Sequence, residues 1–202
     1  MIPGHILQQL RELLQERRIG AGLALLEEYR RAFAEISPAD ASAGLAMGCL
    51  AQWVDVGFDD SGLLQRLLER FSKAVRQTLP LADYIHLRMA EGELAMRRED
   101  LNEALRHLDA VLTICDEVQD RKIAAIATLW KARCLRKAGE YDQALEVTRR
   151  GIVIASNLGL PYLAAVIRTV ESWLLFQKGN TKEALAILAE AEAALLSRTL
   201  WF

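Results

Sequence analysis

The sequence predicts an all-α protein built from stacked antiparallel helix pairs, an α-solenoid, and three observations support this prediction. An Ala-Leu pair recurs every forty residues, beginning at Ala104, Ala144 and Ala184. A turn-forming segment precedes each of these pairs, most clearly around Gly139, which suits the end of one helix before the next begins. Apolar residues follow helical spacing through the chain. A regular period of this length is typical of helical repeats.

The first two expected repeats cover residues 1–39 and 40–80. Residues 1–39 contain two amphipathic segments, and Gly20 and Gly22 fall at the turn between them. Pro38 ends the second helix, because proline disfavours a helical residue before it. The turn at 59–62 separates the two helices of the next repeat, where Leu63 and Leu64 replace the Ala-Leu pair.

Three clearer repeats follow at residues 81–120, 121–160 and 161–202. Their expected helices cover 82–98, 101–118, 121–138, 141–158, 161–178 and 181–198, and Pro161 suits the first turn of a helix. Ala104, Ala144 and Ala184 should let paired helices approach, while the leucine after each alanine should fill the space between them. The prediction is therefore one domain, residues 1–202, with about ten helices whose apolar faces are covered by the neighbouring pair.

Composition and charge exclude several classes of protein. The 202 residues are 52% hydrophobic and carry a formal net charge of -2, so there is no general attraction to nucleic acid or to an anionic membrane. Cys49, Cys115 and Cys134 have neither the number nor the spacing of a disulfide framework or a zinc site. The start does not resemble a signal peptide, and no apolar run reaches the ~18 to 20 residues that span a bilayer. We therefore expect a cytoplasmic protein.

The sequence contains no recognisable catalytic motif. His5, His86 and His107 fall in different helices, and none stands at a metal-ligand spacing from another ligand. Nucleophile-elbow, phosphate-loop and dinucleotide-binding motifs are absent from the sequence. We expect no catalytic residues, no cofactor and no metal, and hence a protein that is not an enzyme.

The repeats resemble the tetratricopeptide repeat (TPR). Gly139 with Tyr141 and the Ala-Leu pairs carry this resemblance, together with small residues at Gly92, Ala132 and Ser172. The period of forty exceeds the usual period of about 34 residues. The usual Trp and Leu are replaced by Arg88, Thr128 and Arg168, and then by Glu91, Lys131 and Glu171. Residues 81–200 are therefore more similar to the variant repeats in the sensor arm of MalT-type bacterial transcription activators. HEAT and armadillo arrays have a similar period, but the Gly-x-Tyr-x-x-Ala-Leu turn favours the TPR.

This resemblance implies a right-handed superhelix whose first helices line a concave groove. Residues forty apart then form columns along the groove, and their aromatic and arginine side chains are of the types that form binding hot spots. The candidate groove residues are Trp53, Met89, Glu93, Met96, Arg97, Leu129, Arg133, Arg136, Lys137, Trp173 and Phe176. An alternative is that Trp53 and Trp173 pack between helices.

Charge is uneven along the repeats. Residues 81–120 contain four basic and ten acidic residues, whereas residues 121–160 contain eight basic and three acidic residues. One interpretation is that neighbouring repeats form ion pairs, each of which contributes little to stability. The other is that Arg133, Arg136 and Lys137 face the groove and bind a carboxylate-bearing partner.

Three functions are compatible with the sequence. The leading hypothesis is a non-catalytic scaffold that binds a protein or peptide segment in its groove. The second is the effector-binding sensor arm of a larger MalT-type transcriptional regulator. The third is a self-associating structural module, because the C-terminal end is apolar where a solenoid normally carries a polar cap. The expected self-association residues, which could instead fold back as a cap, are Leu195, Leu196, Leu200, Trp201 and Phe202.

Overall fold

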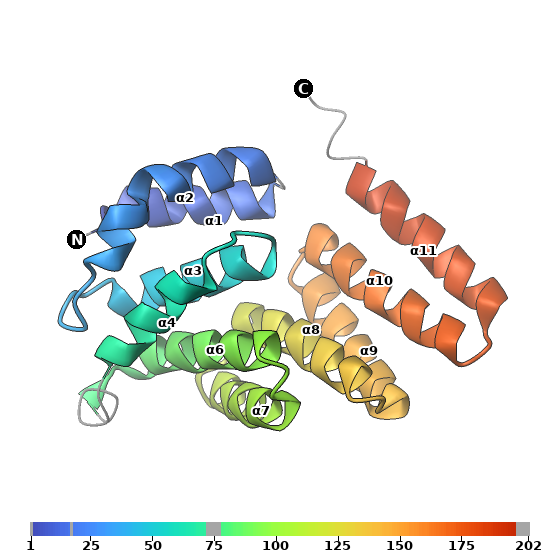
Figure 1. Ribbon diagram of the computed structural model, residues 1–202. Helices are drawn as coiled ribbons and strands as arrows, with labels where there is room; N and C mark the ends of the chain where they lie inside the picture. Colours follow the sequence, from blue (N-terminus) through green and yellow to red (C-terminus); the bar gives the residue numbers. More distant parts are fainter. Residues whose placement is uncertain (1, 17, 72–77, 197–202) are drawn as a thin grey trace. The chain divides into compact units, whose positions relative to one another are not determined.

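The computed structural model describes residues 2–16, 18–71 and 78–196, which form ten helices and no strand (Figure 1). The prediction of an all-α fold is confirmed. The helices are α1 (Gly4–Gln15), α2 (Ile19–Ala34), α3 (Ala43–Asp55), α4 (Ser61–Arg70), α6 (Leu81–Arg97), α7 (Leu101–Val118), α8 (Arg121–Lys137), α9 (Tyr141–Asn157), α10 (Pro161–Gln177) and α11 (Thr181–Leu196). From α6 onward, each helix begins and ends within two residues of its predicted bounds. In the described residues, no helix is both long enough and apolar enough to cross a lipid bilayer.

The chain divides into two compact units, residues 1–98 and residues 99–202. We call them unit 1 and unit 2. The boundary falls between α6 and α7, inside the third expected repeat. A single continuous domain with a right-handed sweep stays a prediction from the repeat pattern.

Unit 1 is organised around α3, which packs against α1, α4 and α6 (Figure 1). Ten of the thirteen residues of α3 are buried, and glycines let its neighbours come close. A Cβ atom added to Gly48 would lie 2.2 Å from Nδ1 of His86 on α6. A Cβ atom added to Gly22 on α2 would lie 1.9 Å from the ring of Trp53 on α3. The absence of a side chain at these glycines is therefore a condition for the packing of unit 1.

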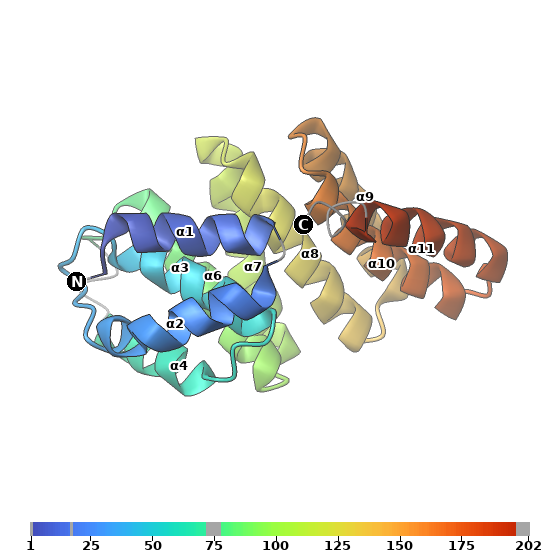
Figure 2. The ribbon, with the colours of Figure 1, turned by 90° about the horizontal axis from the view of Figure 1, so that it is seen from above.

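Unit 2 is a succession of helices in which each of α7 to α10 packs against the helix that follows it, and α8 also contacts α10 (Figure 2). The recurring alanines Ala104, Ala144 and Ala184 are all buried, as the sequence predicts. The leucine that follows each alanine behaves differently. Leu145 is 9% exposed, but Leu185 is 62% exposed. The expectation that Leu185 fills space between helices is therefore wrong.

The turns of the repeats share one backbone conformation. Gly139 and Gly179 both have φ of 83°, and Glu99, forty residues before Gly139, has φ of 61°. The turns between successive repeats, from α7 to α8 and from α9 to α10, have the same conformation, since Gln119 has φ of 59° and Gly159 has φ of 64°. Glycine adopts this left-handed conformation at little cost, whereas other residues adopt it with strain. The period of forty thus persists in the backbone even where the sequence has no glycine.

Candidate functional site

In unit 1, most of the predicted groove residues belong to the core. Trp53 is 0% exposed, and Met89, Glu93 and Met96 are also buried. The alternative interpretation of Trp53, packing between helices, is thus the one that the structure shows. Four of the five predicted groove residues of this unit are thus buried and have little or no surface for a ligand to contact.

Arg97 is the remaining groove candidate of unit 1, and it is exposed. Its guanidinium nevertheless makes internal contacts. Nε donates to Oε1 of Glu93 at 2.9 Å, and Nη2 donates to the backbone oxygen of Val54. Arg97 therefore compensates a buried carboxylate and ties α6 to α3, which is a structural role.

In unit 2, the candidates from α8 and α10 include several accessible side chains. Leu129 is buried, but Arg133, Arg136 and Trp173 are half-buried and Lys137 is exposed. Phe176 is 55% exposed and presents apolar surface to solvent. Unit 2 therefore holds the part of the predicted groove that a partner can reach.

Three side chains from successive helices meet in this region. The Cζ atom of Arg136 on α8 lies 4.7 Å from the centroid of the Trp173 ring on α10. The ring of Tyr141, the first residue of α9, meets Trp173 edge-on with centroids 5.7 Å apart and an interplanar angle of 76°. We call Arg136, Tyr141 and Trp173 the arginine–aromatic cluster. Both contacts have the geometry of favourable interactions, cation–π and T-shaped aromatic respectively.

Tyr141 is absent from the candidate site residues of the sequence, although its place in the repeat indicates a contact with the preceding helix. It follows the turn at Gly139, which returns the chain beside the end of α8, where Arg136 lies. An aromatic residue directly after such a turn is well placed to contact the preceding helix.

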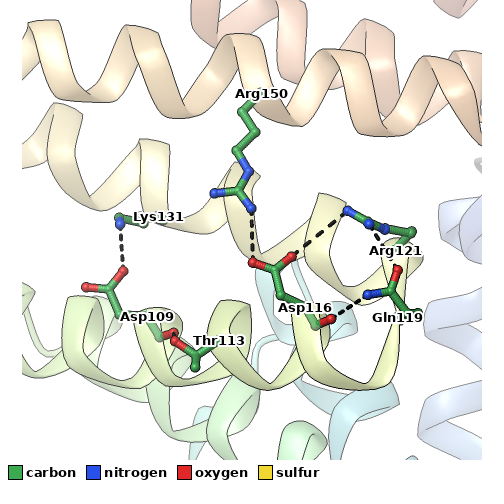
Figure 3. Close-up of polar contacts among 7 residues, drawn as sticks. All are labelled: Asp109, Thr113, Asp116, Gln119, Arg121, Lys131 and Arg150. Carbon is green, nitrogen blue, oxygen red and sulfur yellow. Dashed lines mark hydrogen bonds and ion pairs between the residues drawn. The ribbon is translucent and has the colours of Figure 1, made fainter.

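Most other basic residues of unit 2 are paired with carboxylates, and Figure 3 shows Arg121, Lys131 and Arg150. Lys131 Nζ lies 2.6 Å from Oδ1 of Asp109 on α7. Asp116, also on α7, lies 3.2 Å from Nη2 of Arg150 and 4.0 Å from Nη1 of Arg121. The acidic helix α7 thus forms ion pairs with the basic helix α8 and with Arg150 of α9. For these residues, the ion-pair interpretation of the uneven charge is confirmed.

Arg149 follows the same pattern on the next interface. Its Nε lies 3.0 Å from Oε1 of Glu171 on α10. Each of these pairs is at least partly exposed and adds little to the stability of the fold. Their main effect is to remove positive charge from the surface that they occupy.

Arg136 and Lys137 differ from these residues. Neither makes an ion pair with any other residue that the structure describes. Nε of Arg136 is shielded from solvent and has no hydrogen-bond acceptor among the described residues. A guanidinium held against an aromatic ring can still bind a carboxylate through its terminal Nη groups, by charge-assisted hydrogen bonds.

Metal binding and nucleophilic chemistry depend on the potential metal ligands and the cysteines of the described residues. The described residues include no group of three or more His, Cys, Asp or Glu side chains that could hold a metal ion. Cys49, Cys115 and Cys134 are buried free thiols. Burial raises the pKa of both Cys49 and Cys115 to about 12, so these thiols are protonated and poor nucleophiles at neutral pH.

The structure describes only some of the expected self-association residues at the C-terminal end. On α11, Leu195 is half-buried and Leu196 is 54% exposed. Leu200, Trp201 and Phe202 lie outside the described residues. Of the expected self-association residues, the structure therefore places only Leu195 and Leu196, and self-association stays a prediction.

Comparison with known proteins places the fold. No protein-family model matches the chain, and no curated protein matches it. Two crystal structures are similar, both of a Podosopora anserina protein described as a kinesin light chain with nearly identical TPR-like repeats. One, a variant, has a TM-score of 0.56 at 16% identity and covers 96% of this chain and 95% of its own. The other has a TM-score of 0.53 at 16% identity, with 98% and 96% covered. The chain thus has a TPR-like helical-repeat fold.

Proposed function

We propose that this protein is a non-catalytic scaffold that binds a protein or peptide segment at the arginine–aromatic cluster of unit 2. The observation that supports this most directly is the contrast between Arg136 and its basic neighbours. Lys131, Arg149 and Arg150 are neutralised by carboxylates of adjacent helices, whereas Arg136 is held against Trp173 without an ion pair among the described residues. Positive charge beside Trp173 is thereby left for an external partner.

The chemistry of the cluster indicates the kind of segment that fits. An Asp or Glu side chain of the partner would accept hydrogen bonds from Arg136 and lie near the ammonium group of Lys137. Phe176, one turn after Trp173 on the same face of α10, offers apolar area to a neighbouring side chain of the partner. An acidic residue next to a large apolar residue is therefore the expected core of the bound segment.

Selection from a random-peptide display library tests this proposal. The library should yield peptides that pair an acidic with an apolar residue, and each selected peptide is then measured against variants by fluorescence anisotropy. Arg136→Gln with Lys137→Gln should weaken binding about tenfold or more, since a hydrogen bond to a charged group contributes about 1.5 to 3 kcal/mol. The matched control, Arg150→Gln, removes a basic side chain that is already paired with Asp116. Equal losses in both variants would overturn the site.

The proposal includes a cellular location and an alternative role in a larger regulator. A cytoplasmic location is supported by three buried cysteines that remain free thiols, as expected in a reducing compartment. The role of a sensor arm in a larger MalT-type regulator is supported by the resemblance of residues 81–200. In that case the arginine–aromatic cluster would bind a small anionic effector in place of a peptide.

A further inference from the structure

The helix α11 presents an unusual amount of apolar surface. Of the large hydrophobic side chains that are exposed in the described residues, three lie on this helix: Leu185 is 62% exposed, Leu188 is 43% exposed and Leu196 is 54% exposed. Three alanines lie among them and are also exposed, at positions 186, 189 and 193. This surface, which we call the α11 face, is apolar along most of the helix.

The repeat shows what such a face does elsewhere in unit 2. Forty residues before Leu185 and Leu188 stand Leu145 and Thr148 of α9, which are 9% and 0% exposed. They are buried because α9 packs against both α8 and α10. On α11 the equivalent positions are covered by no helix of the described residues. Leu185 and Leu188 therefore occupy positions that neighbouring helices cover on α9.

We propose that the α11 face is a dimerisation surface on which α11 of a second copy of this chain packs antiparallel. Charge complementarity identifies this occupant. Lys182 lies near the start of α11 and Glu192 lies near its end, both exposed, and neither makes an ion pair within the described residues. An antiparallel pair centred at the level of Ile187 brings each Lys182 opposite the Glu192 of the other copy.

The same alignment also suits the apolar residues. It brings Leu185 of one copy opposite Ala189 of the other at two symmetric positions, so that a large side chain meets a small one each time. The alignment also gives Lys182 a favourable interaction with a helix dipole. Lys182 stands at the positive end of its own helix but beside the negative end of an antiparallel partner.

A head-to-tail arrangement, in which α11 of one copy packs on α1 of another, is disfavoured by the polar surface of α1. The exposed side chains of α1 are polar at most positions, including Gln8, Gln9, Glu12 and Gln15. Packing α11 on α1 of another copy would bury these groups without new hydrogen bonds. An α11–α11 pair is symmetric and closes on itself, which predicts dimers and no larger assemblies. A single helix on each side makes a small interface, so the dimer should be weak and concentration-dependent.

Sedimentation velocity of the full chain over a wide concentration range tests this inference, which is independent of the proposed peptide site. The wild type should shift from monomer to dimer, and Leu185→Gln with Leu188→Gln should remain monomeric with unchanged helical circular dichroism. Val153→Gln is the matched control, because Val153 is 58% exposed on α9 and outside the α11 face. A monomeric wild type, or a double variant that dimerises as well as the wild type, would overturn the dimerisation surface.

A charge exchange tests the antiparallel alignment. Lys182→Glu should weaken the dimer about threefold or more, because it places like charges together at two symmetric positions. Combining Lys182→Glu with Glu192→Lys should restore the wild-type dissociation constant. Failure of the double exchange to restore it would overturn this alignment, and masses that grow beyond the dimer would overturn the closed pair.

Discussion

Trp53 lies so close to Gly22 that a Cβ atom on the glycine would come within 1.9 Å of the indole ring. The two residues belong to α2 and α3, and Trp53 is completely buried. This contact fixes the distance between α2 and the central helix of unit 1. It also explains why Trp53, a candidate groove residue in the sequence, has no contact with solvent.

Gly22→Ala should therefore destabilise the protein. The added methyl group forces the indole ring or the helix to move, and overpacking of this kind costs about 1 to 3 kcal/mol. Urea denaturation followed by circular dichroism measures the loss. Gly20→Ala is the control, since nothing lies within 4 Å of a Cβ atom at Gly20 in the same helix. That variant should be as stable as the wild type or slightly more stable, because alanine favours helices. Equal losses at both positions would contradict the role of the Trp53 contact.

The repeated left-handed turns predict substitutions of opposite sign. Gly139→Ala should cost about 1 kcal/mol of unfolding free energy, because φ is 83° at this position. Glu99→Gly should instead gain up to about 1 kcal/mol, because Glu99 holds the same conformation with φ of 61°. Glu99→Ala removes the carboxylate without relieving the backbone, so it separates the two effects in thermal or urea unfolding. A gain from alanine equal to that from glycine would show that charge, and not backbone strain, decides the result.

Binding of an acidic peptide to the arginine–aromatic cluster should weaken as salt is added. The Debye length falls from about 10 Å at 0.1 M to about 3 Å at 1 M ionic strength, so the attraction of Arg136 and Lys137 for a carboxylate is screened. Titrations by fluorescence anisotropy at several salt concentrations measure this dependence. The Arg136→Gln and Lys137→Gln double variant should show a weaker dependence than the wild type. An affinity that salt leaves unchanged would argue against a charged contact.

The buried thiol of Cys49 predicts a loss of stability at alkaline pH. Its pKa is raised from 9.0 to about 12 in the folded state because burial disfavours the thiolate. The folded chain therefore keeps a proton that the unfolded chain releases above about pH 9. The stability is full below that pH and should fall by about 1.4 kcal/mol per pH unit between the two pKa values. Urea denaturation at pH 8 and pH 10.5 measures the change, and Cys49→Ala should have a slope smaller by one proton.

The helices of unit 2 could be predicted from sequence because their signals repeat. Gly139 and Gly179 mark the ends of α8 and α10, and the Ala-Leu pairs mark the starts of the helices that follow. The burial of each column position could not be predicted in the same way. Trp53 and Trp173 are three periods of forty residues apart and occupy the same column, yet only Trp53 is fully buried. The difference in burial arises from their neighbours, since Trp53 packs on Gly22 and Trp173 packs against Arg136. The spacing of forty residues does not indicate which neighbour each tryptophan has.

The boundary between the two units also could not be predicted from the sequence pattern. The period runs through residue 98 without interruption, so nothing in the spacing separates α6 from α7. Charge was more informative, because the excess of acidic residues in 81–120 did predict partners for basic residues in 121–160. It could not tell which basic residues would be left over, since that depends on how Lys131 and Arg150 reach across to α7.

The matching turns at Gln119 and Gly159 have a consequence for engineering. Because the chain leaves both turns with nearly the same left-handed φ, residues 121–160 begin and end at interchangeable junctions. The segment is in effect a cassette, and a second copy inserted after residue 160 would meet compatible backbone at both joints. Such an insertion would lengthen unit 2 by one helix pair and displace α10 and α11 outward as a block, which offers a way to adjust the spacing of binding surfaces without redesigning a single turn.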